Sequence, residues 1–365
     1  SALRGVRTTI IDPEGEYAPL TRALGGSHIS IAPGSNQFIN PFDIEEEYDE
    51  KTERWIVKVK DKISDNVNLV AVMNGGLDNV QRAFISDAMA EMYVGLGMNE
   101  EPESLYEEVT FFDEKRQEMI HGRDKKKMPT FSDFHNILAE MLEGENDTRL
   151  TSLVKSLSIF KKGGIYDMFD QETSEELKNF KNTPIVTFDV SQLEESVLRP
   201  IGMYVALSWA WEKFGKKNPE IRKRIICDEA WMLLNKNMAG VEFTAQFLEN
   251  VSRRSRKRNA GLLVASQNFL EFADNSNGKA VLTNAFVNIF MRQNSTDIDA
   301  LQHEFHLSDG ERNFLLQAQK GEFLLRMHGD SFVGYALPFD YEIDFISKAN
   351  HQVTGNEDNE IRKGA

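Results

Sequence analysis

Short apolar runs alternate with longer helical patterns in the second half of the chain, and this alternation restricts the fold more than any other feature of the sequence. Buried-strand patterns occur at residues 184–190, 224–228 and 261–266, and helical patterns at 197–214 and 240–258. Strands that alternate with helices pair in parallel through crossovers. Residues 6–11 and 28–32 add two strand patterns near the start of the chain. We therefore predict an α/β fold with a mainly parallel sheet.

Further strand patterns follow at residues 286–291, 322–328 and 331–337. The last two patterns are separated by a short turn and predict a hairpin.

A change of composition divides the chain. From about residue 45 charges are frequent and apolar residues recur every three or four positions, which indicates helices. We predict core residues 1–45, a mostly α-helical inserted subdomain at 46–182, core residues 183–345 and a polar C-terminal tail at 346–365.

The composition excludes several classes of protein. The 365 residues carry 42 basic and 58 acidic side chains, a net charge of −16, so any contact with DNA needs a local basic stripe. The single cysteine, Cys227, excludes a disulfide scaffold and a multi-cysteine metal site. We find no apolar run of about 18 residues and no signal-peptide pattern at residues 1–11, and expect a soluble, intracellular protein.

Asp228 and Glu229 directly follow the apolar run Ile225, Ile226 and Cys227. They are expected at the C-terminal edge of a buried strand, where open α/β sheets bind ligands. Two carboxylates there suit phosphoryl transfer, because one can hold Mg²⁺ and the other can orient or deprotonate the attacking water. The alternative is the first turn of a helix, which favours acids because of its dipole.

Gln267 and Asn268 end the next strand. A polar amide beside the two acids can contact a γ-phosphate or its water. The alternative, that both residues only cap a loop, stays open.

Five cations occupy the six residues 253–258, at the end of the intervening helix. Three interpretations remain open: a solvated basic helix end, an arginine supplied to the nucleotide of a neighbouring subunit, and a contact with DNA phosphates.

Asp12 and Glu14 follow the first strand. If this turn lies near Asp228, Glu14 becomes a candidate for the metal or water network. We count Asp12, Glu14 and Asp228 as candidate cofactor-binding residues, although a plain acidic turn explains the segment equally well.

A nucleotide hydrolase of this type needs the phosphate-binding loop G-x-x-x-x-G-K-[ST]. Gly215–Lys216 and Gly278–Lys279 are not followed by Ser or Thr and lack the second glycine at the required offset. Residues 1–365 contain no such loop.

Five motifs occur in a fixed order: DPEGEY at residues 12–17, INPF at 39–42, DEAW at 228–231, SQN at 266–268 and KGEF at 320–323. Together they resemble the C-terminal motor domain of the large conjugative-transfer ATPase of type IV secretion systems. That family belongs to the hexameric RecA-like translocases, which include the DNA pumps of cell division. The resemblance spans about residues 6–337, and the helical block is similar to the family's all-α insertion.

The resemblance implies a RecA-like P-loop NTPase core that hydrolyses ATP with Mg²⁺. It implies that Asp228 is the metal-linked acid, Glu229 the catalytic base and Gln267 the γ-phosphate sensor. Arg254 or Arg256 would be the arginine finger. The phosphate-binding loop is expected upstream of the strand at residues 6–11, before Ser1; loss of nucleotide binding is the alternative.

The resemblance also implies partners and a location. They are other secretion-channel subunits at the cytoplasmic face of the bacterial inner membrane, and further copies of the chain in a hexamer, although an isolated domain can remain monomeric. DNA is a weaker candidate partner.

The function implied is to energise pilus assembly and the transfer of DNA or protein. Two alternatives remain open. A double-stranded DNA translocase of the cell-division pump type is disfavoured by the net charge of −16 and the acidic insertion. A non-hydrolysing scaffold with a degenerate motor domain would keep its function after Glu229→Gln.

Overall fold

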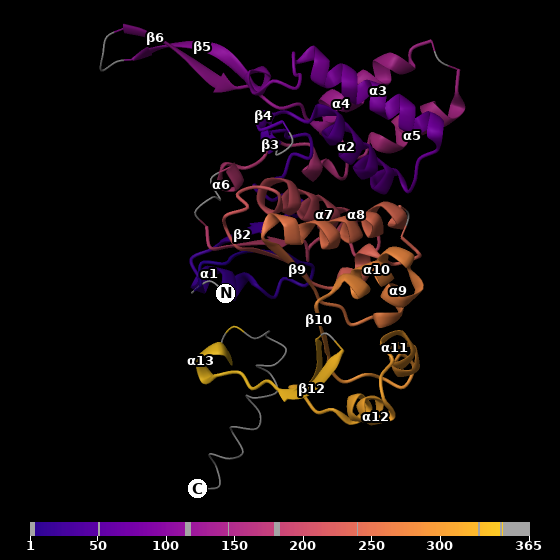
Figure 1. Cartoon of the computed structure of the whole chain (residues 1–365). Helices are drawn as coiled ribbons and strands as arrows, with labels where there is room; N and C mark the ends of the chain where they lie inside the picture. The colour runs from indigo at the N-terminus through magenta and orange to yellow at the C-terminus, as the bar shows by residue number, and fades with distance from the viewer. Residues whose placement is uncertain are drawn as a thin grey trace, which may run out of the picture.

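The computed structural model describes residues 4–49, 52–113, 118–144, 146–178, 183–238, 240–327, 329–343 and 345. Figure 1 shows three tiers: a helical block with a projecting hairpin, a central sheet with its helices, and a small sheet towards the C-terminus. The predicted tail at residues 346–365 lies outside the described residues. No helix in the described part of the chain is long and apolar enough to cross a membrane.

Five strands form the central sheet in the order β2-β7-β1-β8-β9. They are β1 (Arg7–Asp12), β2 (Ser27–Ser30), β7 (Ile185–Asp189), β8 (Lys223–Cys227) and β9 (Ala260–Val264). All four pairings are parallel. β1 and β7 are rich in β-branched residues and almost entirely buried, as strands covered on both faces should be. The prediction of an α/β fold with a mainly parallel sheet is confirmed.

Helices connect and cover these strands. They are α1 (Ala18–Ala23), α7 (Leu198–Trp209) and α8 (Val241–Arg254); α9 (Phe269–Asp274) and α10 (Ser276–Asn284) follow β9, and α10 packs against α8. In Figure 1, α7 and α8 lie between the sheet and the helical block. α7 is buried almost all round for that reason, and it continues as a π-helix over Ala210–Gly215. The single helix predicted at residues 197–214 is therefore two segments.

The helical block is built from residues between β2 and β7. It contains β3 (Glu47–Asp49), β4 (Arg54–Ile56), α2 (Val59–Asn74), α3 (Asn79–Gly95), β5 (Tyr106–Asp113), β6 (Glu118–Lys125), α4 (Phe131–Leu142), α5 (Thr148–Leu157) and α6 (Glu175–Lys178). Phe42, Phe131 and Phe134 are fully buried and pack together at its centre in tilted or edge-on arrangements, with ring centroids 5.6 to 6.1 Å apart. The division of the chain at residues 45 and 182 stays a prediction, and residues 179–182 lie outside the described ranges.

Two hairpins in this block were not predicted from the sequence. β3 pairs with β4, and β5 pairs with β6. The β5–β6 hairpin projects from the body in Figure 1, and none of its side chains that the structure describes is buried, so it leaves no clean alternating pattern. Its cross-strand pair Phe112 and Met119 is more than half exposed on both strands.

A separate antiparallel sheet follows the central one. β10 (Val287–Phe290), β11 (Glu322–Met327) and β12 (Asp330–Tyr335) pair in that order, with α11 (Ile298–Phe305), α12 (Asp309–Gln317) and α13 (Asp340–Ile343) nearby in the chain. The predicted β11–β12 hairpin is confirmed. The strand pattern at residues 286–291 corresponds to β10, which pairs antiparallel with β11.

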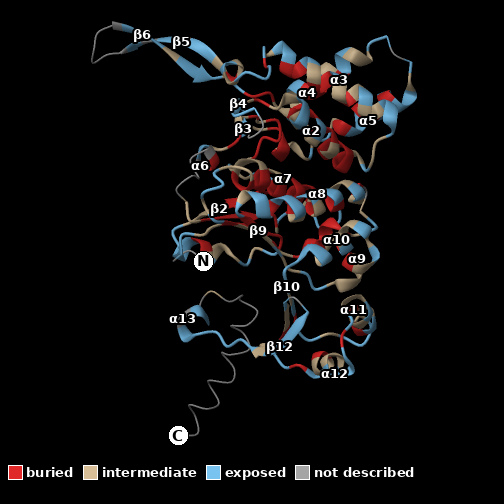
Figure 2. Ribbon diagram, viewed as in Figure 1, coloured by how far each residue is buried: buried red, intermediate tan, exposed pale blue. Residues whose placement is uncertain are grey.

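Figure 2 shows burial concentrated in the central sheet, in α7 and inside the helical block, while the small sheet is mostly exposed. β9 is the last strand of the central sheet and, among the described residues, pairs only with β8. Leu263 on β9 is 44% exposed. The backbone edge of β9 away from β8 is therefore unpaired among the described residues.

Candidate active site

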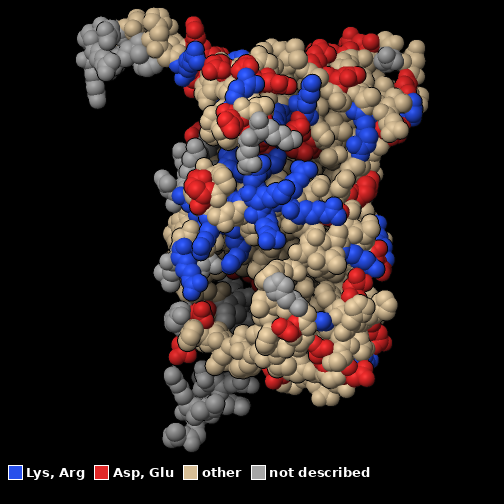
Figure 3. All heavy atoms as spheres, viewed as in Figure 1, with Lys and Arg blue, Asp and Glu red and all other residues tan. Residues whose placement is uncertain are grey.

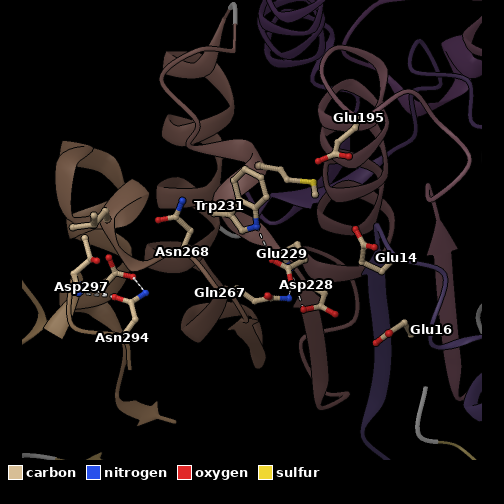
Figure 4. Close-up of a pocket in the computed structure, with 13 residues that line it drawn as sticks. Glu14, Glu16, Glu195, Asp228, Glu229, Trp231, Gln267, Asn268, Asn294 and Asp297 are labelled. Atoms are coloured by element: carbon tan, nitrogen blue, oxygen red, sulfur yellow. Dashed lines mark hydrogen bonds between the residues drawn. The ribbon is translucent and has the colours of Figure 1, made fainter. Parts of the chain in front are cut away.

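The carboxyl ends of β1, β8 and β9 meet at one edge of the sheet, beside a cavity of about 710 Å³. The parallel register aligns Ile11, Cys227 and Val264 on these strands, so the residues that follow each strand come together. Figure 4 shows side chains from the three strand ends and Glu195, from the turn before α7, around one space. The cavity is lined by Glu14, Glu16, Glu195, Asp228, Glu229, Trp231, Met232, Gln267, Asn268, Leu270, Asn294, Thr296 and Asp297.

Asp228 is the first residue after β8, and donors on two sides hold its carboxylate. The Tyr17 hydroxyl donates to Oδ2 at 3.1 Å, and the backbone N–H of Glu229 donates to Oδ1 at 3.0 Å. Burial and then the negative charge of Asp228 raise the pKa of Tyr17 well above its usual range, so this hydroxyl stays protonated and remains a donor.

Glu229 has a left-handed backbone, with φ 44° and ψ 41°. For a residue other than glycine this conformation costs on the order of 1–3 kcal/mol, and such strain is characteristic of functional sites. The residue is 7% exposed. Trp231 donates from Nε1 to Oε2 at 2.6 Å, and Gln267 donates from Nε2 to Oε1 at 2.5 Å. The backbone N–H of Ala230 donates to the Ala265 carbonyl at 3.0 Å, which ties this turn to the end of β9.

Gln267 and Asn268 lie in the loop after β9 and both line the cavity. The structure therefore brings together three of the predicted residues, Asp228, Glu229 and Gln267, from two neighbouring strands. Their individual roles stay predictions.

Asp12 lies behind the cavity, not in its wall. It is fully buried, and its Oδ1 accepts from the backbone N–H groups of Glu14, Gly15 and Glu16 at 3.3, 2.8 and 3.2 Å. Its Oδ2 accepts from the backbone of Tyr17 at 3.0 Å. Burial raises the pKa of Asp12, and these N–H donors oppose the rise. Asp12 thus anchors the loop that carries Glu14 and Tyr17.

Glu14 lines the cavity and is held from behind by Arg199, in the first turn of α7. Arg199 donates from Nη1 to Glu14 at 3.3 Å and from Nη2 to the Ser191 carbonyl at 3.0 Å. Burial raises the pKa of Glu14; Arg199 opposes the rise, and the negative charge of Glu229 adds to it. Glu14 is therefore close enough to Glu229 for their charges to interact.

Arg254 and Arg256 lie far from this cavity in the same chain. Arg254 ends α8, and Arg256 is in the 3-10 turn Ser255–Arg258 that leads into β9. The five-residue strand β9 then runs to Gln267, which places the arginines roughly 16 Å away at the amino end of the sheet. Both are exposed, and no acidic side chain among the described residues bonds either one, whereas Arg253 pairs with Glu249 at 2.7 Å.

The two ends of the sheet have opposite charge. Six carboxylates line the cavity, and no Lys or Arg of the described ranges does. Figure 3 shows Lys and Arg side chains gathered over the end of α8 and the start of β9. Within those ranges, no three His, Cys, Asp or Glu side chains are arranged to hold a metal ion, and the metal role of Asp228 stays a prediction.

Three side chains that donate to the predicted acids received no role from the sequence: Tyr17, Trp231 and Arg199. Tyr17 and Trp231 stand inside the motifs DPEGEY and DEAW, so their adjacency to the acids was an available signal. Nothing in the sequence distinguishes Arg199 from other helical arginines.

Comparison with known proteins places the chain in a family. A family model for the TraG P-loop domain matches residues 3–337, so the chain belongs to the TraG P-loop domain family. This confirms the predicted resemblance to conjugative-transfer ATPases. No curated protein matches.

Solved structures share the fold. VirB4 of Thermoanaerobacter pseudethanolicus is 24% identical with a TM-score of 0.74, over 93% of this chain and 84% of that chain. The plasmid coupling protein TrwB, in complex with the ATP analogue ADPNP, is 12% identical with a TM-score of 0.54, over 91% and 78% of the two chains. The unbound form of the conjugative coupling protein TrwB is 11% identical with a TM-score of 0.55, over 92% and 79%. The predicted RecA-like P-loop ATPase fold is confirmed.

Proposed function

We propose that this chain is the motor domain of an ATP-hydrolysing subunit of a bacterial type IV secretion or conjugation apparatus. There it would energise pilus assembly and the transfer of DNA or protein. The observation that carries the proposal is that hydrogen bonds connect Asp228, Glu229 and Gln267 at the carboxyl edge of the sheet. The backbone N–H of Glu229 donates to the Asp228 carboxylate, and the Gln267 amide donates to the Glu229 carboxylate. Membership of the TraG P-loop domain family supports the same class.

The cavity residues fit ATP bound with Mg²⁺. Mg²⁺ is usually bound by one or two protein carboxylates together with phosphate oxygens and water, so Asp228 would suffice as the main protein ligand. The cation would also offset the repulsion between a triphosphate and six lining carboxylates. Glu229 would orient and deprotonate the attacking water, and Gln267 would contact the γ-phosphate. The ADPNP complex of TrwB supports nucleotide binding in this fold.

The free edge of β9 supports a place for the phosphate-binding loop. A further strand beside β9 would cover Leu263 and bring a loop to the same carboxyl edge as Gln267. We therefore propose that a longer form of the protein supplies this strand and loop.

The arginines support a site shared between copies. Arg254 and Arg256 are exposed at the amino end of the sheet and have no acidic partner among the described residues, so a neighbouring copy could receive one at its own cavity. We propose a hexameric ring, docked through other secretion-channel subunits at the cytoplasmic face of the inner membrane.

Two alternatives make different use of the same residues. A double-stranded DNA translocase would place the basic surface of Figure 3 on phosphates, and its DNA affinity would fall steeply with salt. A non-hydrolysing scaffold would not depend on Glu229.

The test is Mg²⁺-dependent ATP turnover by a longer protein that carries a phosphate-binding loop. Glu229→Gln should lower kcat by about 10²- to 10⁴-fold with folding retained, because a general base is lost. The matched control is Glu91→Gln, an exposed carboxylate in the helical block. Turnover that survives Glu229→Gln would remove Glu229 from the mechanism, whereas a longer protein that neither binds nor hydrolyses ATP would support the scaffold.

A further inference from the structure

We propose that Trp231 is a positioning residue for Glu229: it is the fixed arm of a two-armed clamp on this carboxylate, and Gln267 is the arm that releases. The inference rests on the proposed ATP hydrolysis. It assigns a role to a residue that the sequence left without one.

The clamp is visible in the hydrogen bonds. The indole of Trp231 and the amide of Gln267 each donate to a different oxygen of Glu229, at 2.6 and 2.5 Å. Figure 4 shows the two donors reaching Glu229 from different elements. A carboxylate oxygen has two lone pairs, so each oxygen keeps one acceptor position. The clamp therefore sets the plane of the carboxylate without using up its capacity to accept a proton from water.

The Trp231 arm is local and rigid. Trp231 is two residues after Glu229, in the 3-10 turn Ala230–Leu233. Met232 and Leu233 of that turn are buried in the main core, and the Ala230 N–H is bonded to Ala265 across to β9. The indole cannot leave Glu229 through backbone movement unless the packed turn unfolds.

The Gln267 arm is exposed and comes from a different loop. Turning its amide away from Glu229 costs little packing. A phosphate oxygen would replace the carboxylate oxygen as acceptor, which exchanges one charge-assisted hydrogen bond for another.

The two arms together give a switch. While Gln267 bonds Oε1, that oxygen is partly engaged; when the amide moves to a γ-phosphate, Oε1 becomes free to accept from the attacking water. Trp231 keeps the carboxylate in place during this exchange. Without Trp231, only the strained backbone of Glu229 would restrain it.

The first experiment tests the fixed arm on the chain itself. We would record indole N–H signals of a chain with ¹⁵N-labelled tryptophan and assign the signal of Trp231 with Trp231→Phe. Glu229→Gln should shift this signal, because a neutral amide is a weaker acceptor, whereas Gln267→Ala should leave it in place. If the signal does not change in Glu229→Gln, or if it shifts in Gln267→Ala, the claim that Trp231 holds Glu229 independently of Gln267 is overturned.

The second experiment tests the consequence in the longer protein that carries a phosphate-binding loop. Trp231 would be replaced by 3-benzothienylalanine, which keeps the ring shape but has sulfur in place of N–H. We expect kcat to fall roughly 10- to 100-fold with the KM for ATP unchanged, as for other residues that orient a reacting group. Trp55→Phe, at an exposed tryptophan of β4, is the control.

Full kcat with the isostere would overturn the role of the indole N–H. A fall that appears in Trp231→Phe alone would assign the residue to packing, and would also overturn it. If the wild-type longer protein has no turnover, the proposed function fails, and the indole signals alone decide whether the clamp exists.

Discussion

The two ends of the central sheet are made by the same strands and yet have opposite chemistry. At the carboxyl end, β8 and β9 lead to Asp228, Glu229 and Gln267 beside a cavity lined by six carboxylates. At the amino end, β9 begins beside the exposed Arg254 and Arg256. One copy of the chain thus carries its acidic and its basic side chains at opposite ends of the strands. Under the proposed function, a complete phosphate site would form only between two copies.

The strongest test of this comparison removes the basic end. One of the two variants Arg254→Ala and Arg256→Ala should lower ATP turnover of the assembled longer protein by about 10³- to 10⁵-fold, because an arginine supplied in trans stabilises transition-state charge. The other of the two variants should have a much smaller effect. Lys257→Ala removes an exposed neighbouring cation and is the control. Equal, small effects from all three variants would leave the basic end without a part in hydrolysis.

β8 runs between the two ends of the sheet, and the reactivity of its thiol, Cys227, measures whether this strand becomes accessible to solvent. Burial and then the charge of Asp228 raise the pKa of Cys227 to about 12. At pH 8, we expect a thiol reagent to label the folded chain roughly 10³-fold more slowly than the chain in urea, because the thiolate is the reactive form. Cysteine introduced by Leu263→Cys, on the exposed edge of β9, should react quickly. Rapid labelling of Cys227 in the folded chain would mean that β8 is not closed in the core.

At the acidic end, we expect Asp12 to stabilise the fold and Glu14 to contribute little to stability. Asp12→Ala would leave several loop N–H donors without their buried acceptor and should lower the free energy of unfolding by about 3 kcal/mol. Glu14→Ala, at the half-exposed cavity wall, should change it by less than about 1 kcal/mol. Urea denaturation of both variants measures the difference. Equal losses would show that Asp12 does not anchor the loop.

The smallest effect is expected where charges of both signs meet, between α2 and the π-helix. Burial and then Glu212 raise the pKa of Asp65 to about 6, and Lys216 opposes the rise. The folded chain therefore holds this proton more tightly than the unfolded chain, whose carboxyl has the ordinary value of 3.8. The stability that the group contributes is present at low pH and is lost as the pH rises towards 6.

The corresponding variant is Asp65→Asn. Its stability relative to wild type should rise by about 2 kcal/mol between pH 4 and pH 7 and then stay level. Thermal unfolding at four pH values would measure this. A difference that does not change with pH would mean that Asp65 titrates normally.

The alternation of strand and helix patterns along the chain predicted the α/β fold and its parallel sheet, because buried parallel strands leave continuous apolar runs. The same runs located Asp228, Glu229 and Gln267, since each follows a strand and all carboxyl ends share one edge. The hairpin β5–β6 left no such signal because none of its side chains that the structure describes is buried. The strand pattern of β10 did not show that it pairs outside the central sheet, because a strand pattern does not record its partners.

The remaining details depend on tertiary contacts. Asp12 and Glu14 are two residues apart and look equivalent in sequence, but only the fold shows that one caps a loop and the other faces the cavity. The hydrogen bond from Trp231 and the ion pair of Arg199 with Glu14 are set by side-chain directions, which no spacing rule predicts.

The left-handed backbone of Glu229 has a consequence for engineering. A redesign for thermostability would choose glycine or asparagine at this position and expect a gain of about 1 kcal/mol from relieved strain. Such a variant would express and fold well while lacking the carboxylate that Trp231 and Gln267 hold. Screens that score only yield or melting temperature would therefore select against the residue that the proposed activity needs most.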